Sequence, residues 1–227
     1  MAWTAFQKKH ETMNMVDVMN TENNIGIANP WPVSKGDFRV GNATSCVCVV
    51  TLASEITPSE DMLGNIALWG TCKTENLGIE KIVVNIISNC NVRYVIIAGQ
   101  ESRGHFPGDT MFALYANGID GNGRIIGSNG AIPFIENISE DGIARFVRQV
   151  QLIDMRGISD IGEIGAVVNE HKALKEPFFE EPMVVGTKKK IKKQVQLQDM
   201  TADILITYGI VMDATSGMIY SQTQSDA

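Results

Sequence analysis

A histidine between glycines is the feature of this sequence that most suggests chemistry. His105 lies in the loop Gly99-Gln100-Glu101-Ser102-Arg103-Gly104-His105-Phe106-Pro107-Gly108, which follows an apolar run and precedes a predicted helix start. A neutral imidazole ligates transition metals well, and small neighbours allow a large flat ligand to approach the backbone. His105 is therefore a candidate metal ligand. The alternative is a surface or capping histidine, which is common in such loops.

Other candidate groups are less specific. His10 lies near the N-terminus and His171 at a polar helix end, and the HExxH, GxSxG and GxxxxGK[ST] signatures are absent. Two glycine-rich stretches, 121–123 and 127–130, do not form GxGxxG, so a phosphate cradle has little support. Four carboxylates are possible acid/base groups, although solvated roles at helix ends are the expected ones: Glu55, Glu75, Glu80 and Glu101.

The four cysteines indicate buried, reduced thiols. Cys46 and Cys48 lie inside an apolar run, Cys72 and Cys90 stand apart, and no CxxC pair occurs. These spacings are not typical of a zinc site, and unpaired cysteines suit a reducing compartment. Because residues 1–29 also lack the basic start and apolar core of a secretory signal, we expect a cytoplasmic protein.

Composition excludes several classes of protein. The 227 residues are 44% hydrophobic and 20% charged, as in a soluble globular protein. The net charge of -7 disfavours broad electrostatic binding of nucleic acid. No apolar run approaches the ~18 residues that a membrane helix needs, so no direct membrane span is expected.

Alternating strand and helix patterns predict an α/β fold with a mostly parallel sheet and flanking helices. Short β-branched runs mark buried strands, and apolar residues at helical spacing mark helices. The predicted strands are 46–52, 93–98, 124–126 and 150–154. The predicted helices are 74–88, with Thr74 as N-cap, then 107–117, 139–150 and a helix beginning at Ser159.

The residue composition and the hydrophobic pattern change along the chain, and these changes predict three regions. Residues 1–29 are predicted to be an N-terminal arm, and residues 30–186 an α/β domain. The run Lys188-Lys189-Lys190-Ile191-Lys192-Lys193 starts a third region, residues 187–227, predicted to be a Lys-rich linker and a small β-hairpin appendage. In that appendage, 203–213 and 218–221 flank the turn 214–217.

Several motifs in order along the chain resemble the A subunit of tetrahydromethanopterin S-methyltransferase, the corrinoid-carrying subunit of that enzyme. The longest are Cys72–Lys81 (CKTENLGIEK) and Gly123–Ile138 (GRIIGSNGAIPFIENI), accompanied by Trp31–Asp37 (WPVSKGD), Gly104-His105 with Gly108, and Glu181–Val184 (EPMV). Together they extend from about Trp31 to Val185. On these motifs the chain is identified as a member of that family.

The resemblance implies a Rossmann-like domain that binds a cobamide, a cobalamin-type corrinoid, with His105 near the cobalt. It implies that cobalt cycles between Co(I) and methyl-Co(III), taking the methyl group from methyl-tetrahydromethanopterin and passing it to coenzyme M in methanogenesis. Partner methyltransferase subunits would donate or accept that group. The corrinoid site would lie on three loops, residues 73–76, 99–108 and 127–133 in chain order, with His105 as axial ligand. These residues would bind the cofactor: Lys73, Thr74, Glu75, Asn76, Gly99, Gln100, Gly104, His105, Gly108, Gly127, Ala131 and Pro133.

The chain departs from the family at three points. It has no transmembrane helix at its end, it has Trp69 where the family usually has small residues, and its loop reads GHFPG, with Pro107, where the family usually has GHITG. Arg103 also stands where the general cobalamin signature DxHxxG has aspartate. The sequence therefore does not identify the group that would orient the imidazole.

The favoured hypothesis is a corrinoid-binding methyl carrier, a paralogue of the family's corrinoid-carrying subunit without the membrane anchor. The alternative is a non-catalytic or regulatory paralogue that keeps the fold but binds corrinoid weakly. A nucleotide-binding α/β module remains a third hypothesis.

Overall fold

The computed structural model describes residues 26–185, 203–207, 210–213 and 219–221. The chain divides into two compact units, Met1–Lys188 and Lys189–Ala227. The lysine-rich run and most of the predicted N-terminal arm lie outside the described residues, so the predicted domain boundaries stay predictions. At the end of that arm, Gly26 O accepts from Cys90 N and Ala28 N donates to Ser88 O.

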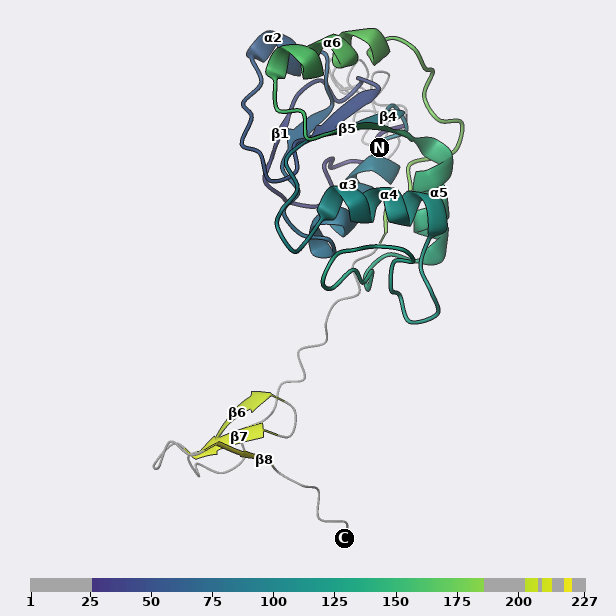
Figure 1. Cartoon of the computed structure of the whole chain (residues 1–227). Coiled ribbons are helices and arrows are strands. Elements are labelled where there is room, and N and C mark those ends of the chain that lie inside the picture. Colours follow the sequence, from purple (N-terminus) through teal and green to yellow (C-terminus); the bar gives the residue numbers. More distant parts are fainter. Residues whose placement is uncertain (1–25, 186–202, 208–209, 214–218, 222–227) are drawn as a thin grey trace, which may run out of the picture. The chain divides into compact units, whose positions relative to one another are not determined.

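A five-stranded sheet forms the centre of the first unit (Figure 1). Its strand order is β1-β3-β2-β4-β5; β1 runs antiparallel to β3, and the other neighbours pair in parallel. The apolar runs of β2 and β4 are buried along their whole length, as expected for the inner strands of a parallel sheet. The strands are β1 (Phe38–Val40), β2 (Val47–Val50), β3 (Leu68–Gly70), β4 (Tyr94–Gly99) and β5 (Gln151–Arg156).

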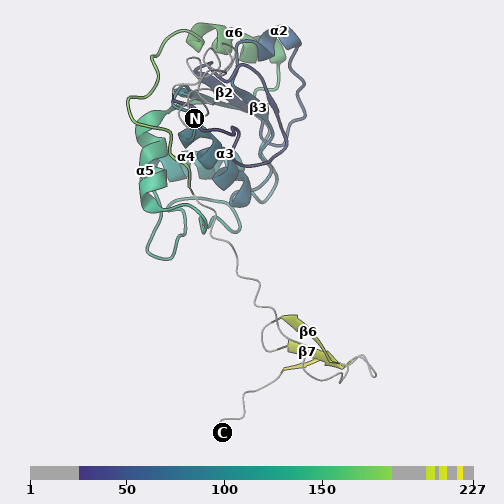
Figure 2. The ribbon, with the colours of Figure 1, turned by 180° about the vertical axis from the view of Figure 1, so that it is seen from behind.

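Helices cover both faces of this sheet, which confirms the predicted α/β fold class. One face carries α3 (Leu77–Ile87), α4 (Pro107–Asn117) and α5 (Glu140–Gln149). The other carries α2 (Glu60–Leu63) and α6 (Ile161–His171), as both views show (Figures 1 and 2). The larger core cluster lies under α3, α4 and α5, and a second cluster lies under α2 and α6.

The topology brings two loops together beyond the end of β2. Strand β2 lies between β3 and β4, so the loops that leave the carboxyl ends of β3 and β4 flank it. Such an edge is where open parallel sheets bind ligands. The loop after β3 contains Glu75, and the loop after β4 contains His105.

Some predicted elements were wrong in detail. Residues 124–126 are not a strand of the sheet: Arg124 and Ile125 form isolated bridges with Phe134 and Ile119 within the connection between α4 and α5. Residues 68–70, where no strand was predicted, form β3. The N-cap of α3 is Asn76 and not Thr74, whose Oγ1 accepts from Gly78 N at 3.0 Å.

The second unit contains three described antiparallel strands, β6 (Asp203–Thr207), β7 (Ile210–Asp213) and β8 (Ile219–Ser221). The segment 203–213 therefore folds as two strands, where the sequence suggested one. The predicted turn 214–217 lies outside the described residues. None of the helices in the described part of the chain has the length and hydrophobicity needed to cross a bilayer.

Candidate functional site

His105 is held by a carboxylate from another loop. Its Nδ1 lies 2.7 Å from Oε2 of Glu75, which is thirty positions earlier in the chain. The Glu75 side chain is 1% exposed, whereas that of His105 is 49% exposed. Among the described residues no hydrogen bond involves His105 Nε2. One ring nitrogen is thus anchored to a buried acid, and the other remains available to a ligand.

Hydrogen bonds keep Glu75 ionised in its buried position. Burial by itself raises the pKa of this carboxyl, but its own backbone N–H, the N–H of Ile132 and the His105 imidazole outweigh that effect. The pKa of Glu75 therefore lies below its ordinary value. An ionised carboxylate is an acceptor only, so it favours the tautomer with a proton on Nδ1 and the lone pair on Nε2.

The third predicted loop closes on the same pair of residues. Ile132 N donates to Glu75 Oε1 at 2.7 Å. A Cβ on Gly130 would lie 2.7 Å from His105 O and 2.8 Å from Glu75 Cγ, so only glycine fits this approach. Ser128 Oγ lies 2.6 Å from Thr110 Oγ1 on α4. The loops predicted to share one site therefore do meet.

A further carboxylate positions the start of α4. Glu101 accepts from Gly108 N at 3.0 Å and from Asp109 N at 2.7 Å, which satisfies two free N–H groups of that helix. A Cβ on Gly108 would lie 2.6 Å from Glu101 Oε1. The N-cap residue Phe106 adopts the left-handed conformation, with φ 46° and ψ 54°. His105 thus projects from a loop that is fixed at both ends.

Glu80 secures the connection between α4 and α5. It is 6% exposed and accepts from Glu136 N, Asn137 N and Asn137 Nδ2. The solvated roles expected for Glu75 and Glu80 were wrong, because both carboxylates are buried acceptors that bind the segment 132–137. Neither role is visible in the sequence, since the partners lie more than fifty positions away.

The other predicted residues lie in the same loops with varied contacts. Lys73 pairs with Glu55 at 3.1 Å on the surface. Gln100 Nε2 donates to Gly157 O, towards the loop after β5. The remaining positions have backbone or capping roles: Thr74 and Asn76 begin α3, Gly99 ends β4, Gly104 and Gly127 have positive φ, Pro133 O accepts from Ile125 N, and Ala131 is exposed.

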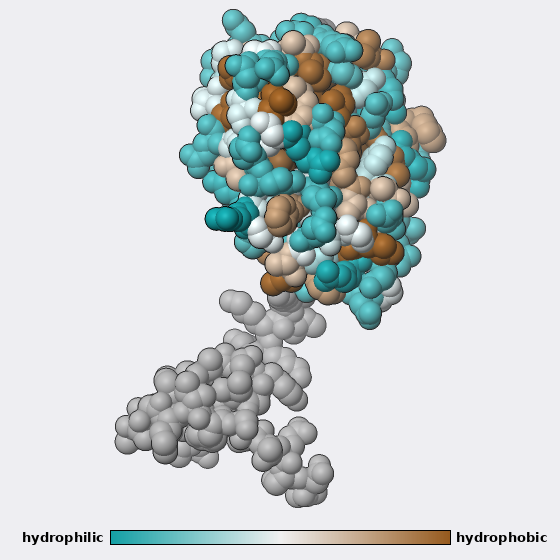
Figure 3. Space-filling view, viewed as in Figure 1, coloured by the Kyte–Doolittle hydropathy of each residue, from teal (hydrophilic) through white to brown (hydrophobic). Residues whose placement is uncertain are grey.

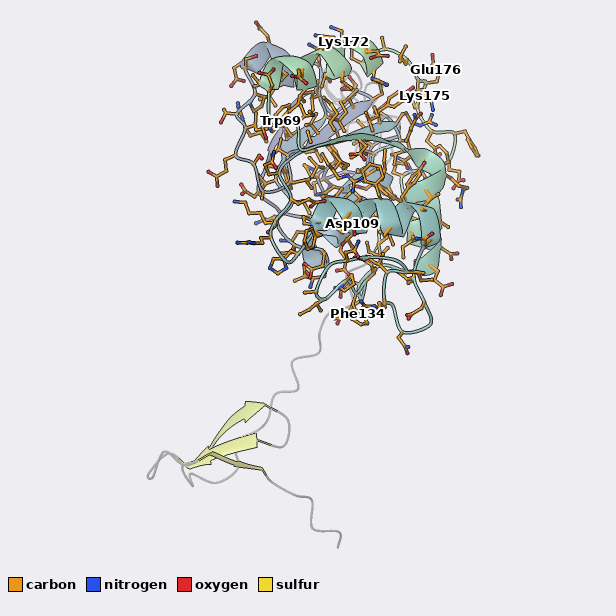
Figure 4. The ribbon with its side chains drawn as sticks, viewed as in Figure 1. Trp69, Asp109, Phe134, Lys172, Lys175 and Glu176 are labelled. Carbon is orange, nitrogen blue, oxygen red and sulfur yellow. The ribbon has the colours of Figure 1, made fainter. Side chains whose placement is uncertain are left out.

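Trp69 lies away from the His105 loop. It belongs to the core cluster under α2 and α6, and its Nε1 donates to Ile56 O at 2.8 Å. Figure 4 shows Trp69 on that side of the sheet and Asp109 on α4 across it. Pro107 begins α4, where a proline is favourable. Neither Trp69 nor Pro107 therefore covers the His105 side chain, which is 49% exposed.

A cavity of about 210 Å³ lies between α3 and the β2–β3 part of the sheet. Cys48, Cys72, Thr74 and Lys81 are among its lining residues, and His105 is not. Burial raises the pKa of the Cys48 and Cys72 thiols to about 12, which makes them poor metal ligands at neutral pH. Within the described residues, no group of three or more His, Cys, Asp or Glu side chains could hold a metal ion.

The sequence reasoning missed several residues that build this site. Gly130 and Ile132 were inside a predicted loop but were not singled out, and Glu101 was considered only as an acid/base group. A glutamate six positions before a helix start gives no periodic signal, because its capping role depends on how the loop folds back. The small residues of the run GSNGAI (127–132) were the available signal that two backbone segments approach each other closely there.

Comparisons with known proteins confirm the resemblance stated above. The sequence profile of the MtrA family, the A subunit of tetrahydromethanopterin S-methyltransferase, matches residues 24–195. The A subunit of a putative methyltransferase named Mtx, from Methanosarcina barkeri, is 48% identical over 193 residues, covering 85% of this chain and 95% of that protein. Two proteins named as the A subunit of tetrahydromethanopterin S-methyltransferase are also similar. The one from Methanosarcina acetivorans is 44% identical over 160 residues (70% of this chain, 66% of its own), and the one from Methanohalophilus mahii 37% over 188 residues (81% and 78%).

Proposed function

Because this chain belongs to the MtrA family of tetrahydromethanopterin S-methyltransferase subunits, we propose that it is a corrinoid-binding methyl carrier in which His105 would ligate the cobalt. The observation that carries the proposal is the His105–Glu75 pair. A half-exposed imidazole has one nitrogen bonded to a buried carboxylate and the other directed to no described partner.

The residues at His105 suit a cobamide. A corrin ring itself supplies most of the ligands of its cobalt, so the protein would need to provide one nitrogen, here that of His105, and not a cluster of side chains. Carboxylates that accept the second ring N–H of a ligating histidine fix the tautomer and raise the basicity of the ligand. In this structure Glu75 makes the contact with the second ring nitrogen of His105. In the signature DxHxxG that contact belongs to the aspartate, and Arg103 stands at the aspartate's position here.

The protein's part in the reaction is to bind, orient and tune. When bound, the cobalt supplies the centre that accepts and releases a methyl group. His105 would contact the metal through Nε2, and Glu75 would hold the ring and stabilise positive charge that develops on it. Glu101 and the close approach of Gly130 would keep the loop in place. Because His105 is half exposed, a cofactor held there would remain accessible to a partner protein.

The names of the relatives support a proposal for the methyl donor, the acceptor and the partners. They are methyltransferase subunits, and some are named for tetrahydromethanopterin. We propose that separate subunits bring the methyl donor and acceptor to this carrier, as part of one-carbon metabolism in methanogenesis. A cytoplasmic location is part of the same proposal.

Reconstitution with hydroxocobalamin tests the proposal. Wild-type protein should form a stoichiometric coloured complex whose visible spectrum shows imidazole coordination. His105→Ala should stay folded, since a half-exposed loop side chain contributes little to the core, with a lower melting temperature because the buried Glu75 loses one of its hydrogen-bond donors. Its bound spectrum should lose the bands of imidazole coordination, because the axial nitrogen is gone.

His171→Ala provides the matched control. His171 bonds Val167 O through Nδ1 and lies edge-on to Tyr94 at the far end of β4, so its loss should leave the bound spectrum unchanged. A wild-type protein that stays colourless would refute the proposal and favour the alternative, a non-catalytic or regulatory paralogue. Identical spectra for wild type and His105→Ala would remove His105 as ligand.

A further inference from the structure

Three large apolar side chains lie exposed at the His105–Glu75 pair. Leu77 is 58% exposed, Phe106 38% and Ile132 59%. Phe106 and Ile132 come from two of the loops that meet there, and Leu77 is the first residue of α3, directly after the remaining loop. Polar and apolar residues are interspersed over the face of the first unit shown in Figure 3. Three of the nine large exposed hydrophobic side chains in the described part of the chain thus gather at one pair of residues.

Covalent and hydrogen-bonded links place these side chains close to the imidazole. Phe106 follows His105, Ile132 N bonds the same carboxylate as His105, and Leu77 is two residues after that carboxylate. Because consecutive Cα atoms are about 3.8 Å apart, the chain keeps all three positions near the His105–Glu75 pair.

Two of the three positions would be better filled by polar residues for local stability. Phe106 is the N-cap of α4 and makes no side-chain capping bond, although Ser, Thr, Asp or Asn is favoured there. It also holds the left-handed conformation, which is rare for a bulky residue and points to a functional constraint. Leu77 is the first residue of α3, where acidic side chains are favoured.

We propose that Leu77, Phe106 and Ile132 form an apolar rim that the face of the corrin ring covers when its cobalt meets His105. The inference rests on the proposed function and adds the residues that set affinity for the ring. A corrin carries methyl groups and apolar ring carbons on its face and amide chains at its edge. The rim therefore matches the face, and His105 sets the position of the metal.

Equilibrium titration with hydroxocobalamin, followed by visible absorbance, tests the rim. Leu77→Ala and Ile132→Ala should each weaken binding about tenfold, because each removes three carbons that are about half exposed before binding. The bound spectra should keep the wild-type band positions, since His105 still coordinates. Phe106 is left unchanged in this test because its substitution would also alter the start of α4.

The matched control is the pair Ile161→Ala and Leu174→Ala. Ile161 is the first residue of α6, as Leu77 is of α3, and the two control side chains are 37% and 56% exposed. Their removal should leave affinity at the wild-type value.

Three results would overturn the inference, and they are distinguishable. Unchanged affinity in both Leu77→Ala and Ile132→Ala, with a wild-type protein that binds, would refute the rim alone. A shifted bound spectrum in either variant would show that the residues act by placing His105. Absence of binding by the wild type would refute the proposed function itself.

Discussion

At the scale of single residues, the pairing of Glu75 with His105 makes stability depend on pH. The pKa of Glu75 in the folded protein lies below its ordinary value, so ionisation favours the folded state above the unfolded pKa. This contribution is lost as the pH falls through the folded pKa. Glu75→Gln should lower the free energy of unfolding by about 2 kcal/mol at neutral pH, because charged hydrogen bonds are lost in a buried position.

Urea denaturation at neutral and acidic pH measures this effect. The difference between wild type and Glu75→Gln should shrink in acid, where the wild-type carboxyl is protonated as well. Glu55→Gln is the control, since Glu55 is 82% exposed and pairs with Lys73 on the surface. Such pairs contribute roughly 0–1 kcal/mol. A difference that stays constant with pH would show that Glu75 is not ionised in the folded protein.

At the scale of elements, the close approach of the third loop depends on Gly130. A Cβ there would lie 2.7 Å from a backbone oxygen, and a backbone atom cannot move aside as a flexible side chain does. Gly130→Ala should therefore destabilise the protein by about 2 kcal/mol, with weaker cobamide binding because the loop around His105 shifts. Thermal unfolding and the hydroxocobalamin titration measure both effects.

Gly121→Ala is the matched control for this loop. Gly121 lies in the same connection between α4 and α5. Apart from its two chain neighbours, no atom in the described part of the chain lies within 4 Å of the position that a methyl group would take there. Its replacement should change stability by at most about 0.5 kcal/mol. Equal melting temperatures for the two alanine variants would mean that the third loop can relax without loss.

At the scale of the whole molecule, one buried arginine joins distant parts of the first unit. Arg145 on α5 is 3% exposed and donates to Glu180 Oε2, Glu181 O and Cys90 Sγ. Its guanidinium carbon also lies 4.5 Å from the Phe178 ring centroid. These contacts hold the segment after α6 against the end of α3, at the opposite ends of the strands from His105.

Arg145→Ala should lower the free energy of unfolding by about 3 kcal/mol, because it leaves several partially buried acceptors without a donor. Arg148→Ala is the control: Arg148 is on the same helix and binds the same Glu180, but its side chain is 52% exposed. It should cost less than about 1 kcal/mol. Chemical denaturation measures the free energy of unfolding of both variants. Equal decreases in the two variants would contradict a special role for the buried Arg145.

The sequence by itself determined the family, the α/β class and the central elements. Strand β4 and helix α4 were predicted within one or two residues, because a β-branched run, a proline start and a glycine stop are local signals. The long motifs identified the family, because specific residues in register do not depend on knowing the fold. His105 stood out for the same reason, as a chemical group in a local glycine context.

Only the tertiary structure decided what surrounds His105. The crossover that places β2 between β3 and β4 brings Glu75 to the imidazole across thirty residues, and no periodicity encodes that distance. Three further features likewise depend on long-range contacts. They are the burial of Glu80, the close approach of Gly130 to the His105 loop, and the face of the sheet on which Trp69 lies. Periodic patterns show which residues are buried, whereas the packing of one loop on another determines which buried carboxylate meets which ring nitrogen.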